Sequence, residues 1–171
     1  MNKAMLWAVL LLPGNALVVI PGVILWLTGP AGYSWDLAPV TAFRFWAACL
    51  PIAGGLTLMV RTVGLFSRHG DGTPAPWDPP RKLVVVGIYR HLRNPMISGV
   101  AAVLFGEALL FKSLALLAWA GIFLLANAIY IPLWEEPRLE RRFGEGYRRY
   151  RRHVPRWFPR LKPWTGPERD D

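Results

Sequence analysis

Two short stretches of the sequence combine charged, aromatic and amide side chains, and both adjoin long apolar segments. They are residues 81–95, RKLVVVGIYRHLRNP, and residues 135–156, EEPRLERRFGEGYRRYRRHVPR. Because each directly precedes or follows an apolar segment, we expect both to meet at one face of a membrane. Adjacent acids at such a face are costly unless they are paired or solvated. Glu135 and Glu136 therefore either pair with neighbouring arginines or bind a cationic or polyhydroxyl ligand.

Other polar side chains near the membrane also have two interpretations. Tyr89 is either an interfacial anchor or an aromatic face for a planar or cationic ligand. Asn94 and Pro95 are a good N-cap and a good first helical residue, so we expect them to start a helix. We expect Glu107 to reach the opposite interface. The three histidines show no metal-ligand spacing, so we predict no metal site.

The distribution of charge along the chain identifies the elements that must position these groups. The 171 residues are 53% hydrophobic, yet the net charge is +9. This combination excludes a disordered chain, a disulfide scaffold and an ordinary soluble globule. About 20 apolar residues suffice to cross a bilayer. The sequence therefore predicts an all-α integral membrane fold with about four transmembrane helices, at Ala4–Trp35, Leu37–Val60, Pro95–Phe111 and Ser113–Trp134.

The connections and the C-terminal region refine this prediction. Pro13 and Pro21 should kink the first helix, and the short Lys112–Ser113 connection should make an antiparallel hairpin of the last two. Apolar and aromatic residues then recur at spacings of three and four, which predicts an amphipathic C-terminal helix. We expect its first two apolar residues to serve packing and its tyrosines either to pack or to line a site. These residues are Leu139, Phe143, Tyr147, Tyr150 and Val154.

Lys and Arg placement predicts the orientation. Six lie between the second and third segments and eleven between Arg138 and the C-terminus, whereas the opposite side has only Arg44 and Lys112. This bias places both termini in the cytoplasm, which we assign to a multi-pass protein of a bacterial inner membrane. Attraction to anionic lipid also explains the basic region better than nucleic-acid binding does. We treat residues 1–171 as one domain: two spans at 1–60, a cytoplasmic loop at 61–94, a helical hairpin at 95–134 and a basic region at 135–171.

The two polar stretches resemble a known pair of motifs. LVVVGIYRHLRNPMISG, residues 83–99, is similar to L-V-x-x-G-x-Y-x-x-x-R-[H/N]-P-x-Y-x-G. The stretch that begins at Glu135 is similar to E-E-x-x-L-x-x-x-F-G-x-x-Y-x-x-Y-x-x-x-V-P. Together they resemble the isoprenylcysteine carboxyl methyltransferases and their bacterial, phospholipid methyltransferase-like relatives, over roughly residues 81–163.

The resemblance implies a membrane methyltransferase that uses S-adenosyl-L-methionine and methylates a lipophilic small molecule. A carboxylate such as Glu135 would hold the amino group or the ribose hydroxyls of the cofactor, and Asn94 its methionine or adenine end. Arg93 and Arg156 are candidates for orienting an anionic group, and no catalytic base is identified. By position, the cofactor-binding residues would be Arg81, Lys82, Leu83, Val84, Tyr89, Asn94, Pro95, Met96, Ile97 and Glu135.

Three positions depart from the motifs. Asn94 replaces the frequent histidine, Ile97 replaces a tyrosine, and Ile131 stands where eukaryotic enzymes have an arginine. The last change argues against the eukaryotic way of handling a prenylcysteine carboxylate. Two alternatives follow: a non-catalytic membrane protein of the same fold and, ranked lower, a nicotinamide-dependent membrane reductase. The reductase would need a phosphate site, but the sequence has no glycine-rich strand–helix turn.

Overall fold

The computed structural model describes residues 7, 10–29, 35–69 and 82–166, and the regular structure within these ranges is helical, without strands. Two elements, η1 and η3, are π-helical, and η2 is a short 3-10 helix. The elements are η1 (Leu10–Val19), α2 (Ile20–Thr28), α3 (Phe43–His69), η2 (Gly87–Arg90), α4 (Pro95–Leu110), α5 (Leu114–Tyr130), η3 (Ile131–Glu135) and α6 (Glu136–His153).

Within the described residues, three helical runs are long and apolar enough to cross a membrane, by length and composition. They are Leu11–Thr28, Phe43–Arg68 and the run that begins at Leu114 and continues through η3 into α6, and α4 is a shorter apolar helix. This arrangement confirms the predicted all-α integral membrane fold. The first run contains the predicted proline sites, with Pro13 inside the π-helical turn and Pro21 at the start of α2. The predicted start of that segment, Ala4, lies outside the described residues.

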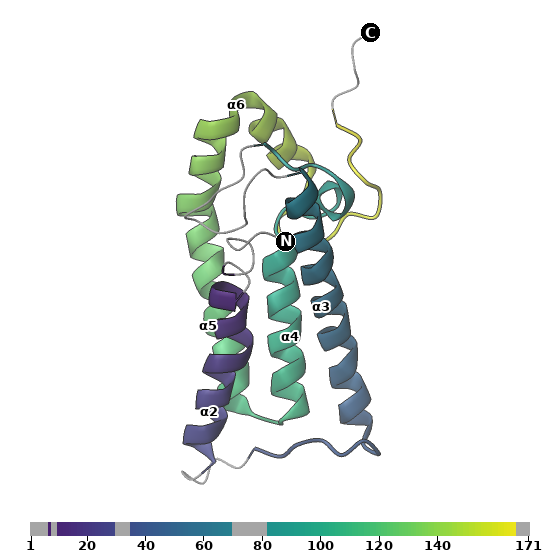
Figure 1. Cartoon of the computed structure of the whole chain (residues 1–171), viewed down its shortest axis with the longest axis vertical. Coiled ribbons are helices and arrows are strands. Elements are labelled where there is room, and N and C mark those ends of the chain that lie inside the picture. The colour runs from purple at the N-terminus through teal and green to yellow at the C-terminus, as the bar shows by residue number, and fades with distance from the viewer. Residues whose placement is uncertain (1–6, 8–9, 30–34, 70–81, 167–171) are drawn as a thin grey trace.

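The shorter helix α4 lies at the centre of the bundle, between α3 on one side and α5 on the other (Figure 1). Its residues Val100, Val103 and Leu104 form a buried core with residues of η1, α3 and α5. Glycines bring α3 and α4 into close contact, because a Cβ at Gly55 would lie 2.5 Å from the backbone oxygen of Gly99. Small residues of this kind allow helices to approach closely within a membrane.

The helix bounds differ from the predicted segments at α3. This helix begins at Phe43 rather than Leu37, because the preceding chain is extended and docks on the end of α4. The backbone N–H groups of Asp36 and Ala38 donate to the carbonyls of Phe111 and Leu110, each at 2.9 Å. At its other end α3 continues past Val60 to His69.

The predicted hairpin of α4 and α5 is confirmed. Its turn has Lys112 at a positive φ of 47°, and the Ser113 side chain accepts a hydrogen bond from the Leu116 N–H at 3.3 Å. The predicted amphipathic helix is α6, which arches over one end of the bundle (Figure 1). Gly144 interrupts it with φ 55° and ψ −131°, a conformation that glycine adopts readily.

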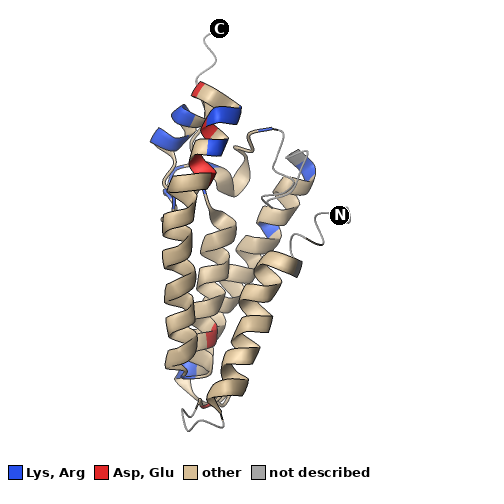
Figure 2. Cartoon of the chain, turned by 90° about the vertical axis from the view of Figure 1, so that its left-hand side faces the viewer, with Lys and Arg blue, Asp and Glu red and all other residues tan. Residues whose placement is uncertain are grey.

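Most of the Lys and Arg residues gather at the end of the bundle that α6 covers (Figure 2). We call this region the basic end. It consists of the last turns of α3, residues 82–94, α6 and residues 154–166. The chain leaves α6 at Val154, which is extended because Pro155 follows. From there it runs back along η2 and completes the basic end.

Candidate functional site

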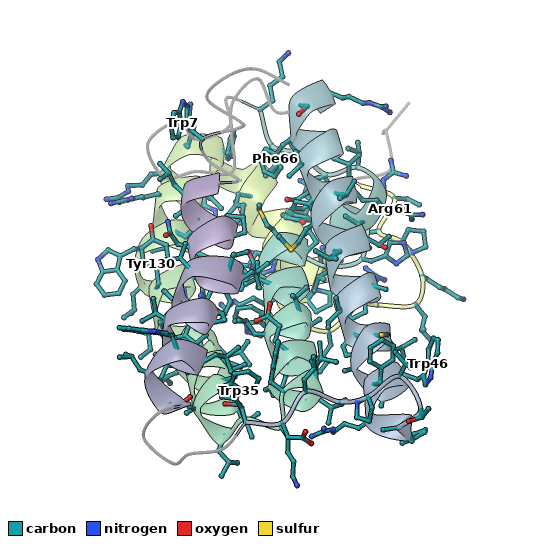
Figure 3. All side chains as sticks on the ribbon, turned by 60° about the horizontal axis from the view of Figure 1, so that its bottom comes forward. Trp7, Trp35, Trp46, Arg61, Phe66 and Tyr130 are labelled. Carbon is teal, nitrogen blue, oxygen red and sulfur yellow. The ribbon has the colours of Figure 1, made fainter. Side chains whose placement is uncertain are left out.

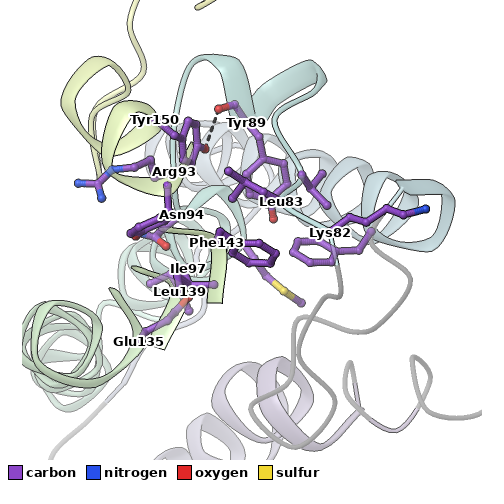
Figure 4. Close-up of a pocket in the computed structure, with 14 residues that line it drawn as sticks. Lys82, Leu83, Tyr89, Arg93, Asn94, Ile97, Glu135, Leu139, Phe143 and Tyr150 are labelled. Carbon is purple, nitrogen blue, oxygen red and sulfur yellow. Dashed lines mark hydrogen bonds between the residues drawn. The ribbon is translucent and has the colours of Figure 1, made fainter. Parts of the chain in front are cut away.

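A cavity opens at the basic end, where the segment before α4 meets η3 and α6 (Figure 4). Its volume is about 160 Å³, and its mouth is open to the surface. Because small-molecule sites typically measure about 300–1,000 Å³, a larger ligand would occupy both the cavity and its mouth. The lining residues are Phe66, Lys82, Leu83, Val84, Tyr89, Arg93, Asn94, Met96, Ile97, Glu135, Leu139, Phe143, Tyr147 and Tyr150.

Aromatic rings fix the wall that η2 contributes. Tyr89 is buried and meets the Phe66 ring of α3 edge to face, with 5.5 Å between ring centroids. The Tyr150 hydroxyl on α6 donates to the Tyr89 backbone oxygen at 2.8 Å. Burial raises the pKa of the Tyr89 phenol well above its usual value, and the neighbouring Tyr150 and Glu135 raise it further. Tyr89 therefore stays protonated and neutral at physiological pH.

The chain after α6 holds η2 in place through backbone hydrogen bonds. The N–H of Arg160 donates to the His91 carbonyl, and the N–H of Trp164 donates to the Arg90 carbonyl, each at 3.0 Å. The His91 Nδ1 lies 2.7 Å from the Arg160 carbonyl, which makes it the donor. The Trp164 ring stacks on His153, with 5.5 Å between centroids. We call this segment, residues 154–166, the C-terminal strap. It was not predicted from the sequence, because its hydrogen bonds to η2 are made by backbone groups.

Glu136 is the centre of a buried charge cluster. Its Oε1 accepts from Arg93 at 2.7 Å and from Arg156 at 2.9 Å, and its Oε2 accepts from Arg156 at 3.0 Å. The side chains of Glu136 and Arg93 are only 5% and 9% exposed. Both arginines that the sequence offered as catalytic candidates are therefore bound to this carboxylate. Arg93 also lines the cavity, whereas Arg156 does not.

Glu135 has different surroundings, although it is the preceding residue. It lines the cavity, and no side chain in the described part of the chain forms an ion pair or hydrogen bond with its carboxylate. Successive helical residues point in directions about 100° apart, which separates the two acids. Of the two interpretations left open by the sequence, pairing with arginines therefore applies to Glu136. The other, ligand binding, is open to Glu135.

Asn94 and Pro95 depart from the sequence prediction in opposite ways. Pro95 is the first residue of α4, as expected, but it is fully buried and does not line the cavity. Asn94 is the N-cap residue of α4, as expected, but its side chain makes no capping hydrogen bond. Its backbone oxygen accepts the Ser98 N–H at 3.1 Å, which is the first hydrogen bond of the helix. This leaves the amide side chain at the cavity wall (Figure 4).

The structure gathers most of the predicted cofactor residues around this cavity. Arg81 lies outside the described residues, and Pro95 lies behind the wall. Glu107, on the far part of α4, is not a lining residue; its Oε2 is buried without a hydrogen-bond partner among the described residues. The predicted residues that do line the cavity are Lys82, Leu83, Val84, Tyr89, Asn94, Met96, Ile97 and Glu135.

The remaining lining residues were assigned differently or were missed. Leu139 and Phe143, which we expected to serve packing, line the cavity as well as packing against the α6 core. Tyr147 and Tyr150, for which both roles were open, also do both. Phe66 was missed, because nothing in its own sequence surroundings connects α3 with the two motifs. The other four residues, on α6, belong to the amphipathic pattern of apolar and aromatic residues that the sequence showed.

The comparisons with known proteins agree with the motif resemblance. A family model described as phospholipid methyltransferase matches residues 43–146. The match begins at the start of α3 and ends within α6, so it includes every cavity-lining residue except Tyr147 and Tyr150. Searches of curated proteins and of solved structures gave no significant match. Among the described residues, no three His, Cys, Asp or Glu side chains gather as a metal site.

Proposed function

The chain belongs to the phospholipid methyltransferase family, and we propose that it transfers a methyl group from S-adenosylmethionine to a lipophilic acceptor. The family match supports a membrane methyltransferase in general. The methyl donor, the acceptor and the membrane face are our proposals. The observation that carries the methyl donor is the Glu135 carboxylate in the cavity wall, which pairs with no side chain in the described part of the chain.

The chemistry of the cavity suits this methyl donor. S-adenosylmethionine has two positive centres, an amino group and a sulfonium, and Glu135 is the lining carboxylate without a cation of its own. The rings of Tyr89, Phe143 and Tyr147 supply aromatic faces, which attract cations and accommodate a planar base. The Asn94 amide can both donate and accept hydrogen bonds. We therefore propose that these residues hold the cofactor, with backbone groups at Leu83 and Val84.

When bound, the cofactor supplies a methyl group that is already activated for in-line displacement. The task of this chain is then to orient the acceptor and to exclude water. Correct positioning can supply roughly 7–11 kcal/mol of a reaction barrier. The side chains suit that role better than proton transfer, because Tyr89 stays protonated and Arg93 is bound to Glu136. We propose Arg93 and Arg156 as positioning residues that anchor α6 over the cavity.

The acceptor and the orientation follow from the membrane setting. The cavity lies at the end of apolar helices, so a lipophilic acceptor can enter from the bilayer with its carboxylate or amine head at the basic end. The strong excess of Lys and Arg at this end favours the cytoplasmic side. We propose a bacterial inner-membrane protein with both termini in the cytoplasm.

Calorimetric titration of the full-length protein in detergent with added lipid tests the cofactor site. We expect micromolar binding of S-adenosylmethionine and of its demethylated product, and a loss of at least tenfold in Glu135→Gln. Glu145→Gln is the matched control, because that side chain is 56% exposed and lies outside the cavity.

The same titration separates the alternatives. Folded protein that binds neither compound would favour a non-catalytic member of the family. Binding of a reduced nicotinamide cofactor in their place would favour the reductase. Equal binding by both glutamate variants would show that Glu135 is not a cofactor residue.

A further inference from the structure

A second groove lies at the basic end, on the other side of η2 from the cavity. It is formed by the last turns of α3, by η2 and by the C-terminal strap, and it shares no lining residue with the cavity. Its cationic lining side chains include Arg61, Arg68 and Arg90, and its apolar ones include Val60, Leu65 and Ile88.

The cations of this groove have few protein partners. Arg61 and Arg68 form no ion pair with any described residue, and Arg90 donates only through Nε to the Val85 carbonyl, at 3.4 Å. Among the described residues, no Asp or Glu lines the groove. Elsewhere at the basic end, Arg93 and Arg156 share Glu136. The groove is thus a concentration of positive charge that the protein itself leaves without a counter-charge in its described part.

The position of the groove matches the boundary between the apolar and polar parts of a membrane. It lies along the last two turns of the candidate span Phe43–Arg68. Val60, at the start of the groove, is 71% exposed, and the arginines follow toward the end of the helix. Arg61, Leu65 and Arg68 recur at spacings of four and three and so share one helix face. A molecule with an apolar tail and an anionic head fits this order of an apolar residue followed by arginines.

We infer that the groove binds the headgroup phosphate of an anionic membrane phospholipid, with the acyl chains along α3. Arginines near the membrane surface attract anionic lipid, each by an amount that corresponds to about a fivefold change in association. The three arginines line one groove, which makes the site more selective than a diffuse basic surface.

A lipid in this groove would contact the back of the cavity wall. Adjacent residues face opposite ways: Ile88 and Arg90 line the groove and Tyr89 lines the cavity. On α3, Phe66 points into the bundle and Arg61 points outward (Figure 3). The bound lipid would therefore brace the segment that carries Tyr89 without entering the cavity.

Native mass spectrometry of the full-length protein in detergent tests the inference, with phosphatidylglycerol or phosphatidylcholine added. We expect stronger retention of phosphatidylglycerol. The double variant Arg61→Gln/Arg68→Gln should weaken it roughly 10–30-fold, which follows from two arginines at about fivefold each. The matched control is Arg138→Gln/Arg149→Gln, which removes the same charge from exposed positions on α6 that line neither site.

Three outcomes would overturn the inference. Equal losses in the two double variants would show diffuse attraction to the basic end. If the unmodified protein shows no preference for phosphatidylglycerol, an anionic lipid is not the ligand of the groove. If millimolar inorganic phosphate displaces the lipid, the groove is a site for soluble anions. If the double variant does not fold, Arg61→Gln and Arg68→Gln are measured singly, and each should weaken retention about fivefold.

Discussion

Replacing Glu136 by glutamine should destabilise the protein far more than the same change at Glu140 on the same helix. Glu136 pairs with two arginines at distances of 2.7–3.0 Å, and its side chain is 5% exposed. The substitution keeps the size of the side chain and removes its charge. Arg93, which is 9% exposed, would then remain as a buried cation with no full counter-charge.

The expected magnitude follows from the burial of each partner. Removing one member of a buried ion pair typically costs about 3–5 kcal/mol, because the other charge is left in a poorly solvated place. Arg156 is 28% exposed and can rehydrate, which places the estimate near the lower limit, about 3 kcal/mol. Glu140 pairs with Arg151 at 3.3 Å and Arg148 at 3.7 Å, both on the surface. Such pairs contribute about 0–1 kcal/mol.

Thermal unfolding of both variants in the same detergent and lipid provides the measurement. For a chain of this size about 1 kcal/mol corresponds to a shift of about 2–4 °C, so Glu136→Gln should lower the midpoint by about 6–12 °C. Glu140→Gln should lower it by no more than about 4 °C. The double variant Arg93→Met/Glu136→Met should recover part of the loss, because it removes both buried charges. Equal midpoints for the two glutamine variants would refute the assignment of Glu136 as the anchor of α6.

Two further substitutions test the packing of the bundle and the wall of the cavity. Gly55→Ala should destabilise the protein by about 1–3 kcal/mol in thermal unfolding, because the new Cβ would lie 2.5 Å from the Gly99 oxygen. In the control Gly54→Ala the new Cβ meets nothing within 4 Å, so this variant should be neutral or slightly more stable. Similar unfolding midpoints for the two variants would contradict the close approach of α3 and α4. Tyr150→Phe removes the donor to the Tyr89 carbonyl and should cost about 1–3 kcal/mol and weaken S-adenosylmethionine binding in calorimetry. Unchanged stability in Tyr150→Phe would show that this hydrogen bond does not hold η2.

The helices were predictable from the sequence because membrane insertion requires long uncharged segments, which composition reveals directly. α4 matches its predicted segment from Pro95 almost to its end at Leu110. The start of α3 was not apparent from composition, because residues 37–42 are uncharged and continue the uncharged segment. What prevents the helix there is docking on the end of α4, through the hydrogen bonds of Asp36 and Ala38. Those bonds depend on tertiary structure and leave no local signal.

The cavity was predictable to the extent that its residues lie in the two motifs. Phe66 comes from a helix outside both, and only the folded structure brings it against Tyr89. The strap that Arg160 and Trp164 make along η2 was hidden for another reason. Backbone donors and acceptors occur in every residue and carry no sequence pattern, so a proline-rich basic tail gave no indication of ordered pairing.

The directions in which Glu135 and Glu136 point relative to α5 depend on the short π-helical turn before α6. Pro132, near the start of η3, has no N–H for the usual hydrogen bond, and the turn widens around it. A π-turn shifts all later side chains around the helix axis relative to α5, so the apolar pattern of α5 does not indicate where the two acids point. In the folded protein Glu136 points to the arginines and Glu135 to the cavity. The two adjacent acids thus lie in opposite surroundings: Glu136 pairs with arginines and anchors α6, whereas Glu135 lies in the cavity wall, where we propose that it binds the cofactor.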